Sequence, residues 1–515
     1  MELRTEGQGA RELSGSYTVC EYKTMSRLLQ PKDGTKRQGR WTGRWREDFW
    51  QPRPGTKWAK GKDWPSIRGP FLTGSAIDCG RPLVSDLKQA RLVWIAEHPL
   101  MGGRGGRRNA IDPRPANDFP RGADAQGGVA VADGRIYLYS AFPDDKKLRP
   151  DTDLMVVRGA PRTAAAKGQF DLALCIEART GQSLWRRELA SLESFATGKQ
   201  GIGLTPCVHE GTVFVRGFRG LYALDAKDGR TFWSDAKLGP KTGSWSHDES
   251  PVVIGGTLLI KTAAATLTGL DPKTGKQLWS HPGVTGNNAI PSRMTFQGRE
   301  IIVSAFGEYY ATKGGRLVAI EPGPGKILAE TDKICPNQNS LCVVGDMVMA
   351  KGELRAGSKS YSSHLAGYDL GADGFQRVWL ADGTAHFAGR FITPLTHRGL
   401  AYVDDPEAGQ FSCMDTANGR PVKQYPGNID KLAGHTGGGH WAIASDDRIV
   451  TSGLLLFSAA PSFDLLGKPL RVSFAIGYCF PIQPALADGR LFIRLNDGLA
   501  CYDLRQSTTE QGENR

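Results

Sequence analysis

A fourteen-residue motif recurs along this chain, and its spacing limits the folds that the chain can adopt. In "LYALDAKDGRTFWS" (221–234) an acid is followed after three residues by a glycine and after three more by a tryptophan. The members of this set of acid, glycine and tryptophan are Asp225, Gly229 and Trp233, then Asp271, Gly275 and Trp279, then Glu177, Gly181 and Trp185, and, with one residue inserted, Asp369, Gly374 and Trp379. Two further segments keep the acid and the glycine but not the tryptophan, Glu321 with Gly325 and Asp415 with Gly419. Successive acids lie 46 to 50 residues apart. That period is typical of propeller blades.

Each repeat also has the same lead-in, a strand, a glycine turn and a second strand, as in "SPVVIGGTLLIKT" (250–262). With the two strands around the motif, every unit is predicted to be a four-stranded antiparallel meander. Units starting near residues 127, 205, 250, 291, 340, 392, 440 and 483 predict an all-β, eight-bladed propeller. The seventh unit is the least regular, because "SFDLLGKPL" (462–470) matches the motif poorly.

The closure of the ring follows from what the last unit lacks. After Asp503 only a polar tail (505–515) remains, whereas "ARLVWIAE" (90–97) is a strand with no neighbouring partner strands. We therefore predict that 90–97 supplies the outermost strand of the last blade, which removes the exposed edges of the ring. The domain organisation is then an N-terminal extension (1–62), a propeller (63–504) and the tail.

The motif has a structural interpretation. The acid can accept hydrogen bonds from turn N–H groups, and the glycine supplies a positive φ in the hairpin. The tryptophan buries on the order of 200 Å², and the next blade is its expected partner. Three cysteines, Cys175, Cys413 and Cys501, stand two residues before an acid, where small residues occur in other repeats. They are expected to pack in the core, and no disulfide framework is expected.

The spacing Ala-x-Asp-x-x-x-Gly-x-x-x-Trp, met by Ala223, Asp225, Gly229 and Trp233, resembles the tryptophan-docking, WD-like motif of the PQQ-like (quinoprotein alcohol dehydrogenase-like) propellers. The resemblance covers roughly residues 63–504. "DWPSIRGP" (63–70) is also similar to the opening of an exported bacterial group in that superfamily. The superfamily contains pyrroloquinoline quinone dehydrogenases and non-enzymatic propellers such as the outer-membrane assembly factor BamB.

The resemblance implies features to look for in an enzyme: a quinone stacked between a tryptophan and a disulfide of adjacent cysteines, Ca²⁺ held by Glu and Asn, and an Asp base. This sequence has no adjacent cysteine pair and no CxxCH haem motif. PQQ and Ca²⁺ are therefore carried as the cofactors of an alternative interpretation, and no metal ligand set is assigned.

In a propeller, the loops that lead into the innermost strands converge at one mouth of the central channel, which is where a ligand is expected. The polar and aromatic residues of these loops are the binding candidates, namely His247, Asn287, Asn288, Asn337, Asn339, His386, Arg390, His435, His440 and Trp441. Asp248 and Glu249 are the candidates for acid–base chemistry or Ca²⁺ binding. Trp441 is the candidate for a stacking floor. A set of ordinary solvated loops is the alternative for all of them.

The first 62 residues hold 14 Lys and Arg against 7 Asp and Glu. Residues 40–64 hold five of the twelve tryptophans. We expect a solvated basic segment and a strap that packs its indoles on the ring, because exposed tryptophans at this density would favour association. The alternative is an arm that binds a partner or a membrane surface. A nucleic-acid partner is not expected, since a basic balance alone is only an electrostatic signal.

The function expected from these features is a non-enzymatic binding or scaffold propeller. It would present a site for a protein or small-molecule partner at the mouth and act as a monomer. The alternative is a PQQ- and Ca²⁺-dependent dehydrogenase of alcohols or sugars. The resemblance implies a location outside the cytoplasm, although the visible N-terminus has no apolar stretch typical of a signal peptide. No apolar run approaches the ~18 residues of a membrane span.

Overall fold

The computed structural model divides the chain into two compact units, Met1–Gly55 and Thr56–Arg515. It describes the strands of the first unit and, in the second unit, residues 58–97, 127–143, 169–192, 204–217, 219–239, 250–262, 266–283, 290–307, 315–334, 341–354, 363–381, 394–405, 409–429, 432, 441–451, 454–467, 484–495 and 498–506. In the first unit, β1 (Glu2–Leu3), β2 (Arg11–Val19) and β5 (Arg37–Trp45) form one sheet, and β3 (Tyr22–Lys23) and β4 (Gln30–Pro31) form another. The side chains of Trp41, Trp45 and Trp50, part of the predicted strap, lie outside the described residues.

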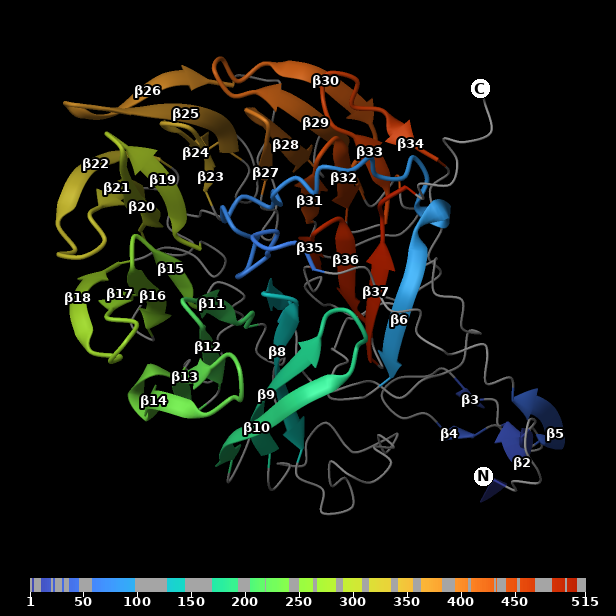
Figure 1. Cartoon of the computed structure of the whole chain (residues 1–515). Coiled ribbons are helices and arrows are strands. Elements are labelled where there is room, and N and C mark those ends of the chain that lie inside the picture. Colours follow the sequence, from blue (N-terminus) through green and yellow to red (C-terminus); the bar gives the residue numbers. More distant parts are fainter. Residues whose placement is uncertain are drawn as a thin grey trace. The chain divides into compact units, whose positions relative to one another are not determined.

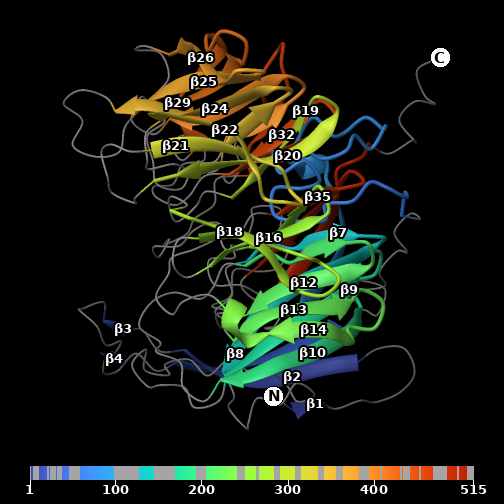
Figure 2. The same cartoon turned by 90° about the vertical axis from the view of Figure 1, so that its left-hand side faces the viewer.

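Eight four-stranded antiparallel sheets make up the ring of the second unit, which confirms the predicted eight-bladed propeller (Figure 1). The strands of blades 1 to 4 are β7 (Ala130–Ala132), β8 (Arg135–Pro143), β9 (Gln169–Glu177) and β10 (Ser183–Leu192); β11 (Cys207–His209), β12 (Thr212–Gly217), β13 (Gly220–Asp225) and β14 (Thr231–Asp235); β15 (Val252–Ile254), β16 (Thr257–Thr262), β17 (Thr266–Leu270) and β18 (Gln277–Pro282); and β19 (Ser292–Phe296), β20 (Arg299–Phe306), β21 (Gly315–Ile320) and β22 (Ile327–Ile334). Figure 2 shows blades 1 and 2 side by side.

Blades 5 to 8 continue the same order from the innermost strand to the outermost. Their strands are β23 (Cys342–Val344), β24 (Met347–Leu354), β25 (Ser363–Gly371) and β26 (Gly374–Leu380); β27 (Leu395–His397), β28 (Leu400–Asp405), β29 (Gln410–Asp415) and β30 (Pro421–Pro426); β31 (Ala442–Ser445), β32 (Arg448–Thr451), β33 (Leu456–Ser458) and β34 (Leu465–Leu466); and β35 (Ala485–Ala487), β36 (Arg490–Arg494), β37 (Gly498–Asp503) and β6 (Arg91–Glu97). The outermost strand of blade 7 has only two residues, in the region where the sequence motif is weakest.

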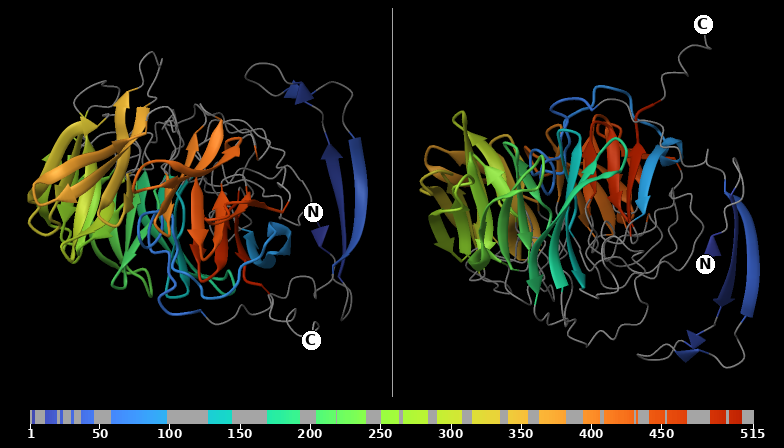
Figure 3. Two further views of the ribbon diagram at one scale, coloured as in Figure 1. Left: turned by 90° about the horizontal axis from the view of Figure 1, so that it is seen from above. Right: turned by 60° about the horizontal axis from the view of Figure 1, so that its bottom comes forward.

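The ring closes through a strand from the N-terminal side of the propeller, as predicted. Strand β6 pairs antiparallel with β37, and Trp94 lies opposite Cys501. Figure 3 shows the segment that contains β6 (blue) beside the strands of the last blade (red). The last blade therefore combines the two ends of the propeller sequence and leaves no unpaired blade edge at the junction.

The tryptophans of the repeat join each blade to the next. The indole Nε1 donates to the carbonyl of the residue that follows the acid of the next blade, at 3.2 Å from Trp185 to Ala226 and 2.9 Å from Trp233 to Pro272. The same bond links Trp279 to Pro322, Trp379 to Thr416 and Trp94 to Ala178. Large aromatic side chains with a hydrogen-bonded tip thus fill the wedge between neighbouring sheets.

The acid and the glycine shape the turn that receives this indole. Asp225 Oδ1 accepts from Lys227 N at 2.7 Å, and Gly229 has a φ of +73°. A Cβ added to Gly229 would lie 2.7 Å from the Trp185 ring. Glycine is therefore needed here both for the backbone conformation and for the close approach of the indole.

Three of the eight blade junctions depart from this pattern, and at one of them the outermost strand of blade 7, Leu465–Leu466, brings no tryptophan to blade 8. In blade 4 the tryptophan position is Ala329, and a Cβ added to Gly374 would lie 3.8 Å from the Ala329 Cβ, which is an ordinary contact. In blade 6 the position is Lys423, whose ammonium contacts Asp464 at 2.5 Å and the Ser462 carbonyl at 2.6 Å. A polar contact thus replaces the indole at the junction with the irregular blade 7.

The core consists of apolar side chains between the sheets. Cys175, Cys413 and Cys501 are fully buried in it, as the small-residue pattern predicts. The cysteines that the structure describes are all free thiols. Within the described part of the chain, no helix is long and apolar enough to cross a membrane.

Candidate functional site

The loops that lead into the innermost strands lie almost wholly outside the described residues. This applies to all the predicted mouth residues except one, that is His247, Asp248, Glu249, Asn287, Asn288, Asn337, Asn339, His386, Arg390, His435 and His440. These positions remain predictions. The structure does describe the starts of the innermost strands and a segment that contacts them.

Trp441 is the one mouth candidate in the described part of the chain. It directly precedes the innermost strand of blade 7 and is partly buried against the core cluster that joins blades 7, 8 and 1. One side of its indole therefore has a packing role. Its prediction as a stacking floor remains untested by this contact.

A segment from the N-terminal side of the propeller occupies the centre of the ring. Figure 1 shows part of the blue segment 58–90 near the innermost strands β27, β31 and β35, and the rest running past β33 and β34 towards β6. We call residues 63–76 of this segment the plug. Trp64 is 1% exposed and exchanges backbone hydrogen bonds of 2.8 and 2.7 Å with Val131 of blade 1. The Pro65 carbonyl accepts from Val208 N of blade 2 at 2.7 Å.

The tip of the plug is a tight turn at Arg68 and Gly69. Both residues have positive φ, +61° and +79°, and Gly69 N donates to the Ser66 carbonyl at 3.0 Å. Gly69 also has no room for a side chain, because a Cβ would lie 2.9 Å from the Trp64 ring. The motif Trp-Pro-x-x-Arg-Gly-Pro therefore specifies a turn that folds back on its own indole.

Arg68 points from this turn towards the mouth. Its guanidinium donates to the carbonyls of Leu341, at 3.3 Å, and of Pro394, at 2.5 Å. These two residues directly precede the innermost strands of blades 5 and 6. They also directly follow the loops that carry Asn337 and Asn339 and that carry His386 and Arg390. Arg68 is 3% exposed, and burial lowers its pKa to about 10, so the group stays charged at neutral pH.

The plug leaves the centre along blades 6 and 7. The Thr73 carbonyl accepts from Thr396 N at 3.1 Å, and Ser75 pairs in parallel with Ala444. Ser75 Oγ lies 2.6 Å from His397 Nδ1, while His397 Nε2 lies 2.7 Å from the Asp446 carbonyl. A carbonyl can only accept, so Nε2 carries the proton and Nδ1 accepts from the serine hydroxyl. Burial lowers the pKa of His397.

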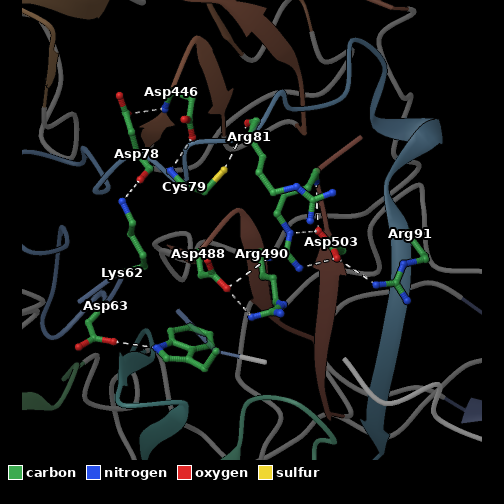
Figure 4. Close-up of polar contacts among 12 residues, drawn as sticks. Lys62, Asp63, Asp78, Cys79, Arg81, Arg91, Asp446, Asp488, Arg490 and Asp503 are labelled. Carbon is green, nitrogen blue, oxygen red and sulfur yellow. Dashed lines mark hydrogen bonds and ion pairs between the residues drawn. The ribbon is translucent and has the colours of Figure 1, made fainter. Parts of the chain in front are cut away.

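Asp78 and Asp446 hold the chain that follows the plug against the turn of blade 7 by hydrogen bonds (Figure 4). Asp78 Oδ1 accepts from Asp446 N at 2.8 Å, and the Asp446 carboxylate accepts from Cys79 N and Gly80 N at 3.0 and 3.2 Å. Lys62 Nζ donates to the Asp78 carbonyl. The reciprocal bonds hold the exit of the plug against the hairpin of blade 7.

A network of ion pairs joins the closing strand β6 to the end of β37 in the last blade (Figure 4). Arg505 binds Asp503 through two bonds of 2.7 and 2.8 Å, and Arg91 of the closing strand binds the same carboxylate at 2.9 Å. Asp488 accepts from Arg490 at 2.8 Å. Burial opposes ionisation of Asp503, but the bonds and the charge of Arg505 outweigh it and hold the pKa of that carboxyl below its usual value.

None of these central residues was among the predicted site residues. "DWPSIRGP" was the signal that could have located the plug, because a run with one buried indole and one arginine is specific. Its position in the channel depends on partners hundreds of residues away, and the spacing of the repeat carries no information about them.

A family model and individual relatives both match this chain. The model of the family described as outer membrane protein assembly factor BamB matches residues 84–308 and 170–425. A quinohemoprotein alcohol dehydrogenase, ADH-IIG, of Pseudomonas putida is 28% identical over 35% of this chain and 26% of its own length. The assembly factor BamB of Burkholderia pseudomallei (strain K96243) is 25% identical over 42% of this chain and 49% of its own length.

The chain thus aligns with less than half of the length of either relative. Among solved structures, BamB from Moraxella catarrhalis is 14% identical, with a TM-score of 0.44, over 65% of this chain and 91% of that one. The eight sheets of the chain itself establish the fold. With the family model matched over more than half of its residues, the chain belongs to the PQQ-like propeller family whose model is described as outer membrane protein assembly factor BamB.

Proposed function

We propose that this chain is a non-enzymatic binding or scaffold propeller that presents its partner site at the mouth of the ring. The observation that carries this proposal is the plug, which fills the centre with the chain's own residues up to Arg68. With the centre occupied in this way, we expect a partner site in the loops that lead into the innermost strands. Loops held by a rigid scaffold are common binding sites.

A protein or small-molecule partner at the mouth and a location outside the cytoplasm are parts of the same proposal. Both are supported by the similarity to a protein named as an outer membrane assembly factor. We infer a monomer, because the closing strand pairs the last blade within the chain itself.

The second candidate is a quinone-dependent alcohol or sugar dehydrogenase. The similarity to the quinohemoprotein alcohol dehydrogenase favours it. Against it, the sequence has no adjacent cysteine pair and no CxxCH motif. Within the described part of the chain, no group of three or more His, Cys, Asp or Glu side chains is placed to hold a metal ion. An enzyme would need Asp248, Glu249 and the loop asparagines for Ca²⁺ and base chemistry and Trp441 for stacking, and we assign no reaction step to them.

Titration with pyrroloquinoline quinone in the presence of Ca²⁺ separates the two candidates. A ligand that binds only the native state at 100 times its Kd stabilises it by about 2.7 kcal/mol, which a thermal melt resolves. Ca²⁺ alone and the Asp248→Asn/Glu249→Gln variant are the controls. Unchanged melting and no dye reduction with alcohols or sugars agree with the scaffold. Saturable binding with dye reduction that the double variant abolishes would replace it by the dehydrogenase.

A further inference from the structure

The sheet β1–β2–β5 of the first unit sorts its residues into two sets by strand register. Trp41 lies opposite Gly15, Leu13 lies opposite Gly43, and Leu3 of the third strand lies opposite Leu13. Successive residues of a strand alternate between the two faces of a sheet, and directly paired residues share a face. The odd-numbered positions of all three strands therefore form one face, which we call the odd face, and the even-numbered positions form the even face.

The two faces differ completely in composition. All nine positions of the even face are polar, and they are Glu2, Glu12, Ser14, Ser16, Thr18, Gln38, Arg40, Thr42 and Arg44. The aromatic and aliphatic residues of the three strands all fall on the odd face, and they are Leu3, Leu13, Tyr17, Val19, Trp41 and Trp45. A sheet partitioned in this way presents one face to water and the other to an apolar surrounding.

The described strands of the first unit provide no second layer of matching size for the odd face. The remaining strands, β3 and β4, have two residues each, whereas β2 and β5 have nine. A ladder of two residues is too short to cover a face of nine. A contiguous apolar face of this length marks an interaction surface.

The charges of the sheet indicate what kind of surface fits the odd face. On the even face Arg44 lies opposite Glu12, so opposite charges share one register position. Within the three strands the odd face carries Arg11 and Arg37, at its two ends, and no acid. The whole unit, Met1–Gly55, contains 11 Lys and Arg against 7 Asp and Glu. A surface that covers the odd face should therefore be apolar and negatively charged.

We propose that the odd face lies on the surface of a bilayer that contains anionic lipids. Trp and Tyr are enriched at the membrane–water interface, because their rings combine an apolar body with a polar tip. Arginines near that interface are attracted to anionic headgroups, while their aliphatic stems extend along apolar surface. A bilayer supplies apolar depth and negative charge over a plane, so a flat sheet needs no partner of matching shape. This surface does not depend on the proposed function of the mouth.

The test is sedimentation of the whole protein with vesicles of phosphatidylglycerol and phosphatidylcholine in equal parts. We expect binding that weakens with salt and is roughly tenfold weaker on vesicles of phosphatidylcholine alone. Trp41→Ser/Trp45→Ser should weaken binding by roughly tenfold, because binding scales with the buried apolar area. Trp41→Phe/Trp45→Phe should recover a large part of it. Brominated phosphatidylcholine in the vesicles should quench the tryptophan fluorescence of the wild type more than that of the serine variant.

Two matched variants remove the same charge from opposite faces. Arg11→Gln/Arg37→Gln should bind more weakly than Arg40→Gln/Arg44→Gln, since only the first pair belongs to the odd face. Equal losses would overturn the orientation of the sheet on the bilayer. Absence of vesicle binding by the wild type, or a serine variant that binds like it, would overturn the proposal. A serine variant that melts at lower temperature, with no vesicle binding by the wild type, would replace the membrane by a strap on the ring.

Discussion

The indole of Trp94 lies against Gly181, with an added Cβ at 2.7 Å from the ring, and its Nε1 donates to Ala178 at 3.0 Å. Trp94 belongs to the closing strand of blade 8, whereas Gly181 belongs to the turn of blade 1. The contact that joins consecutive blades elsewhere in the ring thus also joins blade 8 to blade 1, where the ring closes. A tryptophan and a glycine in the same geometry join consecutive blades and also close the ring. Closure therefore uses the same contact that the repeat provides elsewhere.

Replacement of Trp94 by alanine should open this junction more easily than any other part of the ring. Loss of a buried tryptophan costs roughly 3–5 kcal/mol, and here the loss falls on a strand that no hairpin connects to its blade, since β6 pairs with β37 from the other end of the propeller sequence. We expect a lower urea midpoint and early protease cleavage near residues 91–97. Trp185→Ala, between blades 1 and 2, is the matched control: equal early cleavage of 91–97 in that variant would contradict a specific role of Trp94 in closure.

Turn glycines with positive φ should tolerate alanine better where no indole lies against them. Gly275 has a φ of +71° and would bring a Cβ to 2.7 Å from Trp233, whereas Gly256 has a φ of +75° with nothing within 4 Å. Both variants carry the backbone cost of about 1–2 kcal/mol. Gly275→Ala should lose roughly 1–3 kcal/mol more through overpacking. Chemical denaturation of the two variants measures the difference, and equal losses would show that the close approach has no energetic weight.

Arg68 should be required for the stability of the plug. In Arg68→Ala the Pro394 carbonyl loses a buried donor, at about 1–3 kcal/mol for an unsatisfied group, and the Leu341 carbonyl keeps only its bond from the Ser292 hydroxyl. Arg68→Lys keeps the charge but loses the planar fork that spans two acceptors, so it should recover only part of the stability. Thermal melts with Arg179→Ala as an exposed control check this order. A lysine variant as stable as the wild type would mean that charge alone is sufficient.

His397 should make the anchoring of the plug dependent on pH. Burial lowers its pKa in the folded state, so the folded protein binds fewer protons there than the unfolded chain. This contribution is complete above the ordinary histidine pKa of about 6.5 and is lost as the pH falls through the lowered value. The charged groups that face His397 are Asp78, Asp446 and Arg398. Burial opposes ionisation of Asp78, but the hydrogen bonds and the charge of Arg398 help to hold the pKa of Asp78 below its usual value.

Urea unfolding at pH 8, 7, 6 and 5 compares the wild type with His397→Gln, which keeps an N–H donor but does not titrate. The wild type should lose its advantage over the variant below pH 6.5, by about 1.4 kcal/mol for each unit of pKa difference. An advantage that stays constant from pH 8 to pH 5 would exclude His397 as the cause.

The repeat by itself determined the blades of this protein. The acid, glycine and tryptophan lie within nine residues of one another, so the turn and the indole can be derived from local chemistry, as at Asp225, Gly229 and Trp233. The period predicted eight sheets, and the unpaired strand with Trp94 predicted closure. The irregular outermost strand of blade 7 also follows from the weak match of its sequence.

Only the tertiary structure decided what lies at the centre of the ring. Arg68 finds its acceptors at Leu341 and Pro394, and Ser75 finds His397, over separations of several hundred residues. Such contacts do not repeat along the sequence. They depend on where a single non-repeated segment lies among the eight blades. Local patterns fix the repeated elements because their partners are near in sequence, whereas the plug depends on partners that become neighbours only after the blades have assembled.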